Sequence, residues 1–319
     1  MILTRGDKQV DFVTEASANA IDPNRLRLRD IAQVTIKVIK DGYVDFADSN
    51  MRFTRHYIRQ SADDTVRGTV YFGPGTPWLH CWWQGPPLGV AERHGNLTVQ
   101  ILKMSALQGA RRRPASKIGL LNFASAVKPG GEFMNGANAQ EESIARSSTL
   151  YLSLESHLAT PFYELHTRDN RGGFYSHAMI YSPSVAIFRD DNGDWLCPYH
   201  VDIVTCPAVN AGLVRKLRLP YTEGKILSEM KERMGRILAL FERSGIRNLV
   251  LGSFGTGVFQ NDIGSLAKIW GELLVAPGSR FAHSFDEVIF AIPDSYTFQI
   301  FEMGFNAGAN PHQIWHPQM

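Results

Sequence analysis

The chain has 319 residues, of which 44% are hydrophobic and 20% are charged, a composition typical of a soluble globular protein with a full core. Its net charge of +2 lacks the strong basic clustering of nucleic-acid-binding proteins, so we expect no direct DNA binding. The short apolar runs and the first ten residues predict neither a membrane span nor a secretory signal. Three cysteines cannot all pair within one chain, so we expect an intracellular protein, cytoplasmic or, in a eukaryote, nuclear.

The N-terminal third has one clear periodic segment. Residues 24–42 carry apolar side chains near helical spacing and end at a glycine, which predicts a helix. Prolines and glycines in residues 72–89 break regular structure, and we expect Trp82 and Trp83 to cover a core there. The basic run from Arg111 to Arg113 is typical of a solvated helix end, with a polyanionic ligand as the alternative.

From residue 96 onwards, strand and helix patterns alternate. Apolar runs bounded by turn residues predict strands within residues 96–115, 116–125, 184–208, 246–255 and 285–294. Helical spacing predicts helices within residues 96–115, 141–157, 222–245 and 262–274. One apolar face of the long third helix is formed by Ile226, Met230, Met234, Ile237 and Leu238. This alternation predicts an α/β fold with a largely parallel sheet.

Two predicted strand-to-helix loops are rich in glycine. Backbone N–H groups can approach an anion at such positions because no side chain intervenes. Neither loop has the P-loop pattern or the Rossmann fingerprint. Ligands of these sheets bind beyond the carboxyl ends of strands, so two such loops on neighbouring strands would hold a diphosphate from both sides. The glycines are Gly130, Gly131 and Gly136 in residues 122–142, and Gly252, Gly255 and Gly257 in residues 252–262.

Glu141 and Glu142 stand side by side at the predicted start of a helix. The helix dipole stabilises each carboxylate by roughly 0.3–1 kcal/mol, which is a structural explanation of the pair. Acid–base catalysis is the alternative, and the dipole acts against it because it lowers the carboxyl pKa values. Consecutive helical residues are about 100° apart, so we expect that the two side chains do not both point into one site.

These motifs together resemble the microbial-type poly(ADP-ribose) glycohydrolases, which are built on the macrodomain fold. The family's mark is a glycine triplet followed by Gln-Glu-Glu, and here it is PGGEFMNGANAQEESIARSSTLY, residues 129–151. The likeness continues in MIYSPSVAIFRDDNGDWL, VDIVTCPAVNAG and LVLGSFGTGVFQND, and it covers roughly residues 25–295. It implies a three-layer α/β/α macrodomain with a mixed, largely parallel sheet in residues 96–308. An N-terminal helical extension, residues 1–95, would pack on it, and residues 309–319 would form a tail.

The resemblance implies that Glu142 is the catalytic acid. Glu142 would protonate the leaving oxygen of the ribose–ribose bond, an oxocarbenium-like sugar would form, and water would attack it, oriented by a diphosphate oxygen or by Glu142 acting as a base. Glu141 would hold the distal ribose or brace the loop, and no cofactor or metal is implied. Histidines such as His177 and His200 are expected in the core or on the surface rather than as ligands.

The remaining roles also come from the resemblance alone. Phe259 would pack against the distal ribose, Asn122 would bond a ribose or its loop, and Gln140 would support the geometry of the glutamates. Two backbone stretches would approach the substrate. They are Gly130 and Gly131 in the first loop, and Gly255, Thr256, Gly257 and Val258 in the diphosphate loop.

The sequence departs from the family pattern at Glu132, where the third glycine of the triplet is expected. Glycine adopts a positive φ freely and glutamate does not, and a glutamate also adds negative charge near an anionic ligand. If Glu132 points to solvent, little changes; otherwise turnover of the polymer is weakened.

Three functions follow as hypotheses. The first is a monomeric enzyme that releases ADP-ribose from the ends of poly(ADP-ribose) on modified proteins, in the reversal of ADP-ribosylation and the DNA damage response. The second is a non-catalytic macrodomain that binds ADP-ribose, favoured by Glu132 and opposed by the intact glutamate pair. The third is a hydrolase of another ADP-ribose adduct.

Overall fold

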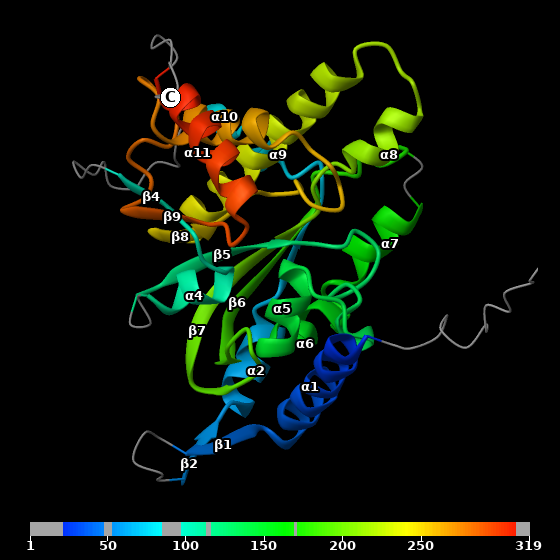
Figure 1. The fold of residues 1–319 in the computed structure, drawn as a ribbon, viewed down its shortest axis with the longest axis vertical. Helices are drawn as coiled ribbons and strands as arrows, with labels where there is room; N and C mark the ends of the chain where they lie inside the picture. The colour runs from blue at the N-terminus through cyan, green and yellow to red at the C-terminus, as the bar shows by residue number, and fades with distance from the viewer. Residues whose placement is uncertain (1–21, 48–52, 85–96, 113–115, 169–170, 311–319) are drawn as a thin grey trace, which may run out of the picture.

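The structure is a computed structural model that describes residues 22–47, 53–84, 97–112, 116–168 and 171–310 (Figure 1). Three expected features fall at least partly outside these ranges. They are the first 21 residues of the N-terminal extension, Arg113 of the basic run, and nearly all of the C-terminal tail. Within the described part of the chain, every helix is too short or too polar to cross a lipid bilayer.

The described residues form a seven-stranded sheet in the order β3-β6-β7-β5-β8-β9-β4. The five strands from β7 to β4 run parallel, whereas β6 pairs antiparallel with β7, and β3 pairs antiparallel with β6. A separate hairpin joins β1 to β2. The strands are β1 Tyr43–Ala47, β2 Phe53–Tyr57, β3 Val70–Phe72, β4 Thr98–Leu102, β5 Ile118–Phe123, β6 Met179–Arg189, β7 Trp195–Cys206, β8 Asn248–Leu251 and β9 Glu287–Ala291.

Helices cover both faces of this sheet (Figure 1). One core lies under α9, α10 and α11, and a second lies between the opposite face and α4 to α7. The predicted three-layer α/β/α architecture with a mixed, largely parallel sheet is therefore confirmed. The longer helices are α1 Pro23–Asp41, α2 Arg59–Arg67, α5 Gln140–Ser147, α7 Thr160–Arg168, α9 Thr222–Arg243, α10 Ile263–Leu274 and α11 Ser295–Ala309. The shorter ones are α3 Pro77–His80, η2 Trp82–Gln84, α4 Ala106–Arg111, η3 Phe133–Asn135, α6 Leu150–Glu155 and α8 Ala211–Lys216.

The strands and helices predicted from residue 96 onwards are present, except that one predicted helix is divided in two. In α9, the five residues of the predicted apolar face are buried, as the helical spacing requires. In the N-terminal third, α1 ends at Gly42, whose φ of +82° is the left-handed conformation that glycine adopts without strain. The end of α4 confirms the solvated helix end at Arg111 and Arg112, both of which are exposed.

The structure differs from the predictions in three places. The segment 72–89, expected to lack regular structure, contains α3 and η2, because Pro77 occupies the first turn of α3, where its missing N–H is no loss. The predicted helix 141–157 is two helices, α5 and α6, because Ser148 is extended and forms a bridge with Ile187 of β6. Eight further elements of the described residues were not predicted: α2, α7, α8, α11, η3, β1, β2 and β3.

The tryptophans divide between core and surface. The Trp82 ring stacks on Phe281 with centroids 5.9 Å apart, and its Nε1 donates a hydrogen bond to Glu232 at 2.8 Å. Trp83 is half exposed. The prediction that they cover a core therefore holds for Trp82 only.

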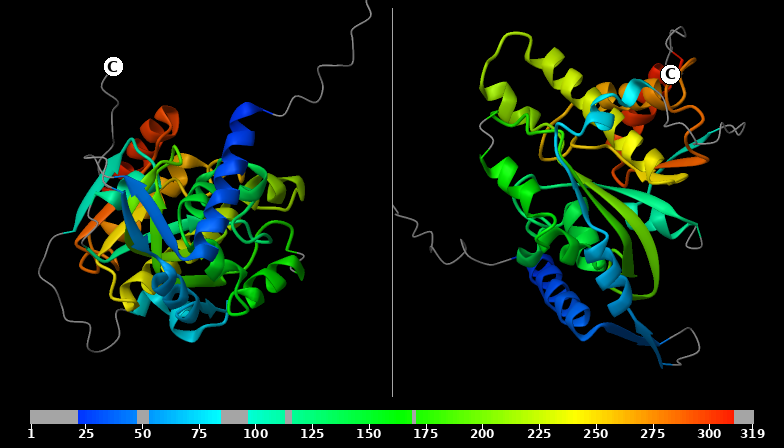
Figure 2. Two further views of the ribbon diagram at one scale, coloured as in Figure 1. Left: turned by 90° about the horizontal axis from the view of Figure 1, so that it is seen from below. Right: turned by 180° about the vertical axis from the view of Figure 1, so that it is seen from behind.

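The N-terminal segment is not separate from the rest of the molecule. Figure 2 shows α1 and the β1–β2 hairpin at the end remote from α10 and α11. Strand β3 completes one edge of the main sheet, and α1 packs beside η3 and α5. Arg25 donates from Nε to the Asn135 carbonyl at 2.8 Å, and Thr35 donates to the Arg146 carbonyl at 2.6 Å. These bonds connect α1 to both ends of the segment that carries the paired glutamates.

Candidate active site

A cleft of about 770 Å³ lies where the loops after β5, β8 and β9 meet the N-terminus of α5. These three strands are hydrogen-bonded side by side in parallel, so their carboxyl ends meet at one edge of the sheet. The two glycine-rich loops follow β5 and β8, which are neighbouring strands, so the condition under which the sequence predicts a diphosphate held from both sides is met. Eight of the predicted site residues line this cleft: Gln140, Glu141, Glu142, Gly255, Thr256, Gly257, Val258 and Phe259.

Both carboxylate oxygens of Glu141 are held by hydrogen bonds beneath the cleft. Oε2 accepts the backbone N–H of Ser125 at 2.6 Å, and Oε1 accepts Nδ2 of Asn122 at 3.3 Å. Burial of the side chain raises the pKa of Glu141 to about 8, although these two bonds oppose the shift. For Glu141, desolvation therefore outweighs the pKa-lowering effect expected at a helix N-terminus.

Glu142 has only one of its two carboxylate oxygens engaged. Its Oε1 accepts the backbone N–H of Glu132 at 3.0 Å. Its Oε2 is buried and makes no hydrogen bond to any described residue. Since Glu142 also lines the cleft, this oxygen is the one that remains available to exchange a hydrogen bond or a proton with a ligand.

The two glutamates meet at Gly131, so the expectation that they would not both point into one site is wrong. A Cβ built on Gly131 would lie 2.3 Å from Oε1 of Glu142 and 3.2 Å from Oε2 of Glu141. The helical angle of about 100° separates the Cβ directions, but the three side-chain torsions of glutamate let both carboxylates turn toward the preceding loop. Gly131 has a φ of +61°, and the absence of a side chain makes room for both groups.

Three further predicted residues support the glutamates from behind. Gln140 bridges to β5, because its Oε1 accepts the Phe123 N–H at 2.9 Å and its Nε2 donates to the Leu121 carbonyl at 2.7 Å. Asn122 is fully buried and does not line the cleft; besides Glu141, its Nδ2 contacts Thr205 at 3.2 Å. Gly130 has a φ of +67° and packs against Phe133.

Glu132 points away from the glutamate pair. Its φ of −105° is ordinary for any residue, so the backbone does not need glycine there. Its side chain is 39% exposed and bonds Lys128 and Asn135. These two partners hold the pKa of Glu132 below its usual value. Glu132 therefore faces solvent, which is the alternative in which the substitution changes little.

The second glycine loop forms the opposite wall of the cleft. Gly255 has a φ of +76°, and a Cβ there would lie 2.3 Å from Cβ of Ala208, so only glycine fits. Asn261 closes the loop through bonds from its Nδ2 to the carbonyls of Gly255 at 2.9 Å and Val209 at 2.7 Å. Gly257 faces open space, since a Cβ there would meet nothing within 4 Å, and Val258 beside it is 84% exposed.

Phe259 ends the loop and is partly buried against the core. Its ring contacts that of Tyr175, with centroids 6.0 Å apart and planes inclined by 39°. Tyr175 was not predicted as a site residue. Tyr175 lies in the segment before β6 and has a φ of +53°, a conformation that is uncommon for a residue other than glycine.

Two polar groups that the sequence analysis did not identify also line the cleft. Asp191, in the turn between β6 and β7, accepts hydrogen bonds from Ser105 at 2.5 Å and Ser143 at 3.1 Å. Asp294, after β9, caps α11 by accepting the Thr297 N–H at 2.7 Å. The position of Asp294 directly after a predicted buried strand is a usable signal. Asp191 offers no such signal, because it lies within the segment 184–208 that was predicted as strands.

Comparison with known proteins gives a consistent family. The family model described as microbial-type PARG, catalytic domain, matches residues 32–190. The poly(ADP-ribose) glycohydrolase from Thermomonospora curvata is 35% identical with a TM-score of 0.78, and the match covers 88% of this chain and 100% of that chain. Its structure bound to the inhibitor ADP-HPD is 34% identical with a TM-score of 0.75, covering 87% and 98%.

A second bacterial enzyme agrees. The poly(ADP-ribose) glycohydrolase from Deinococcus radiodurans, solved in complex with ADP-ribose, is 34% identical with a TM-score of 0.68, and the match covers 78% of this chain and 98% of that chain. The comparison with curated proteins found no match.

Proposed function

Because this chain belongs to the microbial-type poly(ADP-ribose) glycohydrolase family and is a glycoside hydrolase, we propose that Glu142 is the acid that cleaves the ribose–ribose bond of poly(ADP-ribose). The observation that carries this assignment is the difference between the two glutamates. Both oxygens of Glu141 are engaged with protein donors, whereas Oε2 of Glu142 has no partner among the described residues. A general acid needs such an oxygen, because the proton has to pass to the leaving group.

The reaction then has three steps. Glu142 protonates the ribose oxygen that leaves, the glycosidic bond breaks, and an oxocarbenium-like distal ribose forms. The Glu132 N–H, which donates to the other oxygen of Glu142, stabilises the carboxylate that remains. A water molecule, deprotonated by Glu142 acting as a base or oriented by a diphosphate oxygen, then attacks the sugar and completes the hydrolysis.

Glu141 holds the distal ribose or braces the loop. Its raised pKa supports the first role, because a protonated carboxyl group adds no negative charge beside an anionic substrate. Its hydrogen bonds to Ser125 and Asn122 support the second. Asn122, Gln140, Gly130 and Gly131 keep the two carboxyl groups in place from beneath the cleft.

The loop from Gly255 to Val258 binds the diphosphate, and Phe259 packs against the distal ribose. The open face at Gly257 supports the first role, because a phosphate can approach the backbone there without meeting a side chain. The position of Phe259 in the same cleft as Glu142 supports the second.

The enzyme cleaves from chain ends and acts on poly(ADP-ribosyl)ated proteins. α1 packs against the loop that precedes α5, since the Arg25 carbonyl lies only 2.1 Å from where a Cβ of Gly136 would be. In this proposal residues 96–308 form the glycohydrolase domain of a monomer, residues 1–95 are an extension that braces the catalytic loop, and residues 309–319 are a tail.

The test compares Glu142→Gln with Glu141→Gln and the wild type. Release of ADP-ribose from purified poly(ADP-ribose) should fall by about 10²–10⁴-fold in Glu142→Gln, the range that general acid–base catalysis contributes. Binding of free ADP-ribose should stay within a few-fold, because glutamine keeps the size and hydrogen-bonding capacity of the side chain. Undiminished release by Glu142→Gln would overturn the assignment.

The same experiment distinguishes the alternatives. Binding of ADP-ribose by the wild type without release from the polymer would make the protein a reader, or a hydrolase of another adduct. Product analysis with mono-ADP-ribosylated protein as the substrate separates these two.

A further inference from the structure

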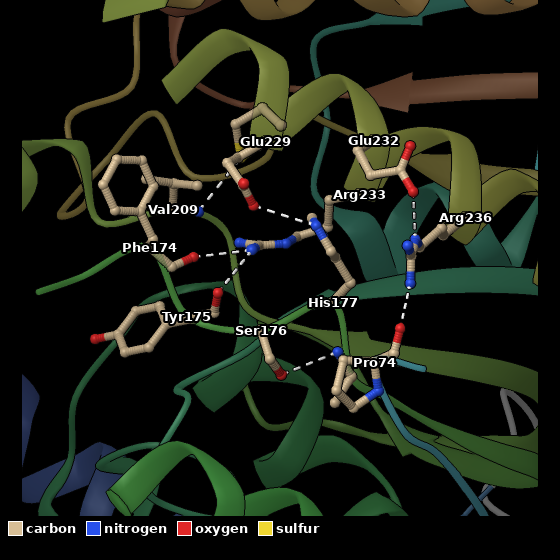
Figure 3. Close-up of polar contacts among 12 residues, drawn as sticks. Pro74, Phe174, Tyr175, Ser176, His177, Val209, Glu229, Glu232, Arg233 and Arg236 are labelled. Carbon is tan, nitrogen blue, oxygen red and sulfur yellow. Dashed lines mark hydrogen bonds and ion pairs between the residues drawn. The ribbon is translucent and has the colours of Figure 1, made fainter. Parts of the chain in front are cut away.

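Arg233 on α9 is a fully buried cation whose hydrogen bonds all go to backbone carbonyls (Figure 3). Its Nη1 donates to Pro207 at 3.0 Å, and its Nη2 donates to Phe174 at 2.8 Å and to Tyr175 at 3.3 Å. Pro207 follows β7, and Phe174 and Tyr175 precede β6. The Arg233 side chain therefore links the backbone after the C-terminal end of β7 to the backbone before the N-terminal end of β6.

Both segments held by Arg233 support the second glycine loop of the cleft. Ala208, next to Pro207, fills the space that a side chain at Gly255 would need. The ring of Tyr175 contacts the rings of both Phe259 and His166, with centroid distances of 6.0 and 5.9 Å. The loop is thus supported at both of its ends, at Gly255 and at Phe259.

The backbone of Tyr175 is itself held in an unfavourable conformation. A φ of +53° strains a residue that has a Cβ, and such strain persists only where the surroundings impose it. The hydrogen bond from Arg233 to the Tyr175 carbonyl is one of these constraints. In this conformation the aromatic ring contacts both His166 and Phe259, the residue proposed to pack against the distal ribose.

We propose that Tyr175 and Arg233 are positioning residues of the glycohydrolase: Arg233 fixes the two backbone segments beneath the diphosphate loop, and Tyr175 holds Phe259 against the distal ribose. The role of Tyr175 rests on the proposed function, because that function assigns Phe259 to the distal ribose. The role of Arg233 in supporting the loop rests only on the contacts described above.

The same helix provides a matched control. Arg236, three residues further along α9, is also buried and donates to a backbone carbonyl, that of Pro74 at 2.7 Å (Figure 3). Its other partners are Glu232 at 2.7 Å and His80 at 2.9 Å. The segments that Arg236 holds do not line the cleft. Replacement of either arginine by methionine removes a buried cation. Only Arg233→Met also removes hydrogen bonds to the backbone segments that support the second glycine loop of the cleft.

Two measurements test the proposal. In the first, titration with free ADP-ribose should show at least a tenfold loss of affinity in Arg233→Met and less than a threefold change in Arg236→Met, with the folded state of both checked by circular dichroism. Equal affinities in two folded variants would overturn the role of Arg233. This measurement needs no turnover, so it remains decisive even if the wild type fails to hydrolyse poly(ADP-ribose).

In the second, Tyr175→Gly removes the ring and tolerates the positive φ, whereas Tyr175→Phe keeps the ring. Tyr175→Gly should lower kcat on poly(ADP-ribose) at least tenfold while KM changes by less than threefold, because Phe259 loses the ring that positions it, whereas Ala208 still supports the diphosphate loop at Gly255. Tyr175→Phe should retain the wild-type kcat. If Tyr175→Gly keeps the wild-type kcat, or Tyr175→Phe loses as much as Tyr175→Gly, the role of the Tyr175 ring is wrong. This pair also decides the case if Arg233→Met does not fold.

Discussion

The backbone N–H of Glu132 donates a hydrogen bond to Oε1 of Glu142 at 3.0 Å, while the side chain of Glu132 turns toward Lys128 and Asn135. The residue that departs from the family pattern thus contributes through its backbone, which any residue except proline provides. Its ordinary φ explains why a glutamate is accepted where glycine was expected.

Glu132→Gly should therefore retain ADP-ribose release within about twofold of the wild type, since the N–H donor is unchanged. Glu132→Pro should lose at least about tenfold in kcat, because it removes a donor to a charged group, worth roughly 1.5–3 kcal/mol. Steady-state rates on poly(ADP-ribose) measure both. Equal loss in the two variants would mean that the side chain, and not the N–H, matters.

Gly131→Ala should reduce kcat by about 10²-fold and destabilise the fold by about 1–2 kcal/mol. The added Cβ meets Oε1 of Glu142 at 2.3 Å and adopts a positive φ, which strains an alanine. Gly245→Ala is the control, because Gly245 also has a positive φ, +71°, but a Cβ there meets nothing within 4 Å. Chemical denaturation should show similar losses of stability in both variants. A similar loss of kcat in the control would contradict the role of Gly131.

Gly257→Glu should lower the affinity for ADP-ribose by at least about 10²-fold without unfolding the protein. The position is open and its φ is not positive, so the side chain fits, but it fills the diphosphate loop and repels the anion. Gly224→Glu adds the same charge at another open position, in the first turn of α9 away from the cleft, and should bind normally. Isothermal titration with ADP-ribose compares the two. Unchanged affinity in Gly257→Glu would mean that the diphosphate loop is elsewhere.

Stability should depend on pH through Glu141. Burial raises the pKa of Glu141 from 4.5 to about 8, so between these pH values the folded protein keeps a proton that the unfolded chain has lost. The contribution to the free energy of unfolding is therefore fully present below pH 4.5 and is lost as the pH rises through 8, with a slope of up to about 1.4 kcal/mol per pH unit.

Glu141→Gln should flatten this slope, because its amide stays neutral. Asn122 can accommodate the glutamine, since its Oδ1 has no partner among the described residues and can accept after rotation of the amide. Urea unfolding of the wild type and of Glu141→Gln at pH 5, 6, 7 and 8 measures how the free energy of unfolding of each depends on pH. The same pH dependence in both proteins would show that the raised pKa does not belong to Glu141.

Much of this protein was predictable from local patterns. Alternating strands and helices gave the α/β class, because burial of one face of each element produces a periodicity that the chain itself displays. The glycine loops and the Gln-Glu-Glu element identified the candidate site, and the strand order confirmed that the two loops are neighbours. The break at Ser148 was not visible, because a bridge to Ile187, 39 residues away in the chain, produces it.

The sequence by itself determined the fold class, the two loops and the identity of the paired glutamates. Only the tertiary structure decided how these glutamates differ. Glu141 binds Asn122 and Ser125, which come from β5 and its loop, while Glu142 turns to the Glu132 N–H and keeps one oxygen without a partner. The same holds for Tyr175 and Arg233, which are 58 residues apart in the chain and meet through a hydrogen bond to a backbone carbonyl. Such contacts depend on the packing of distant elements, and local periodicity carries no information about them.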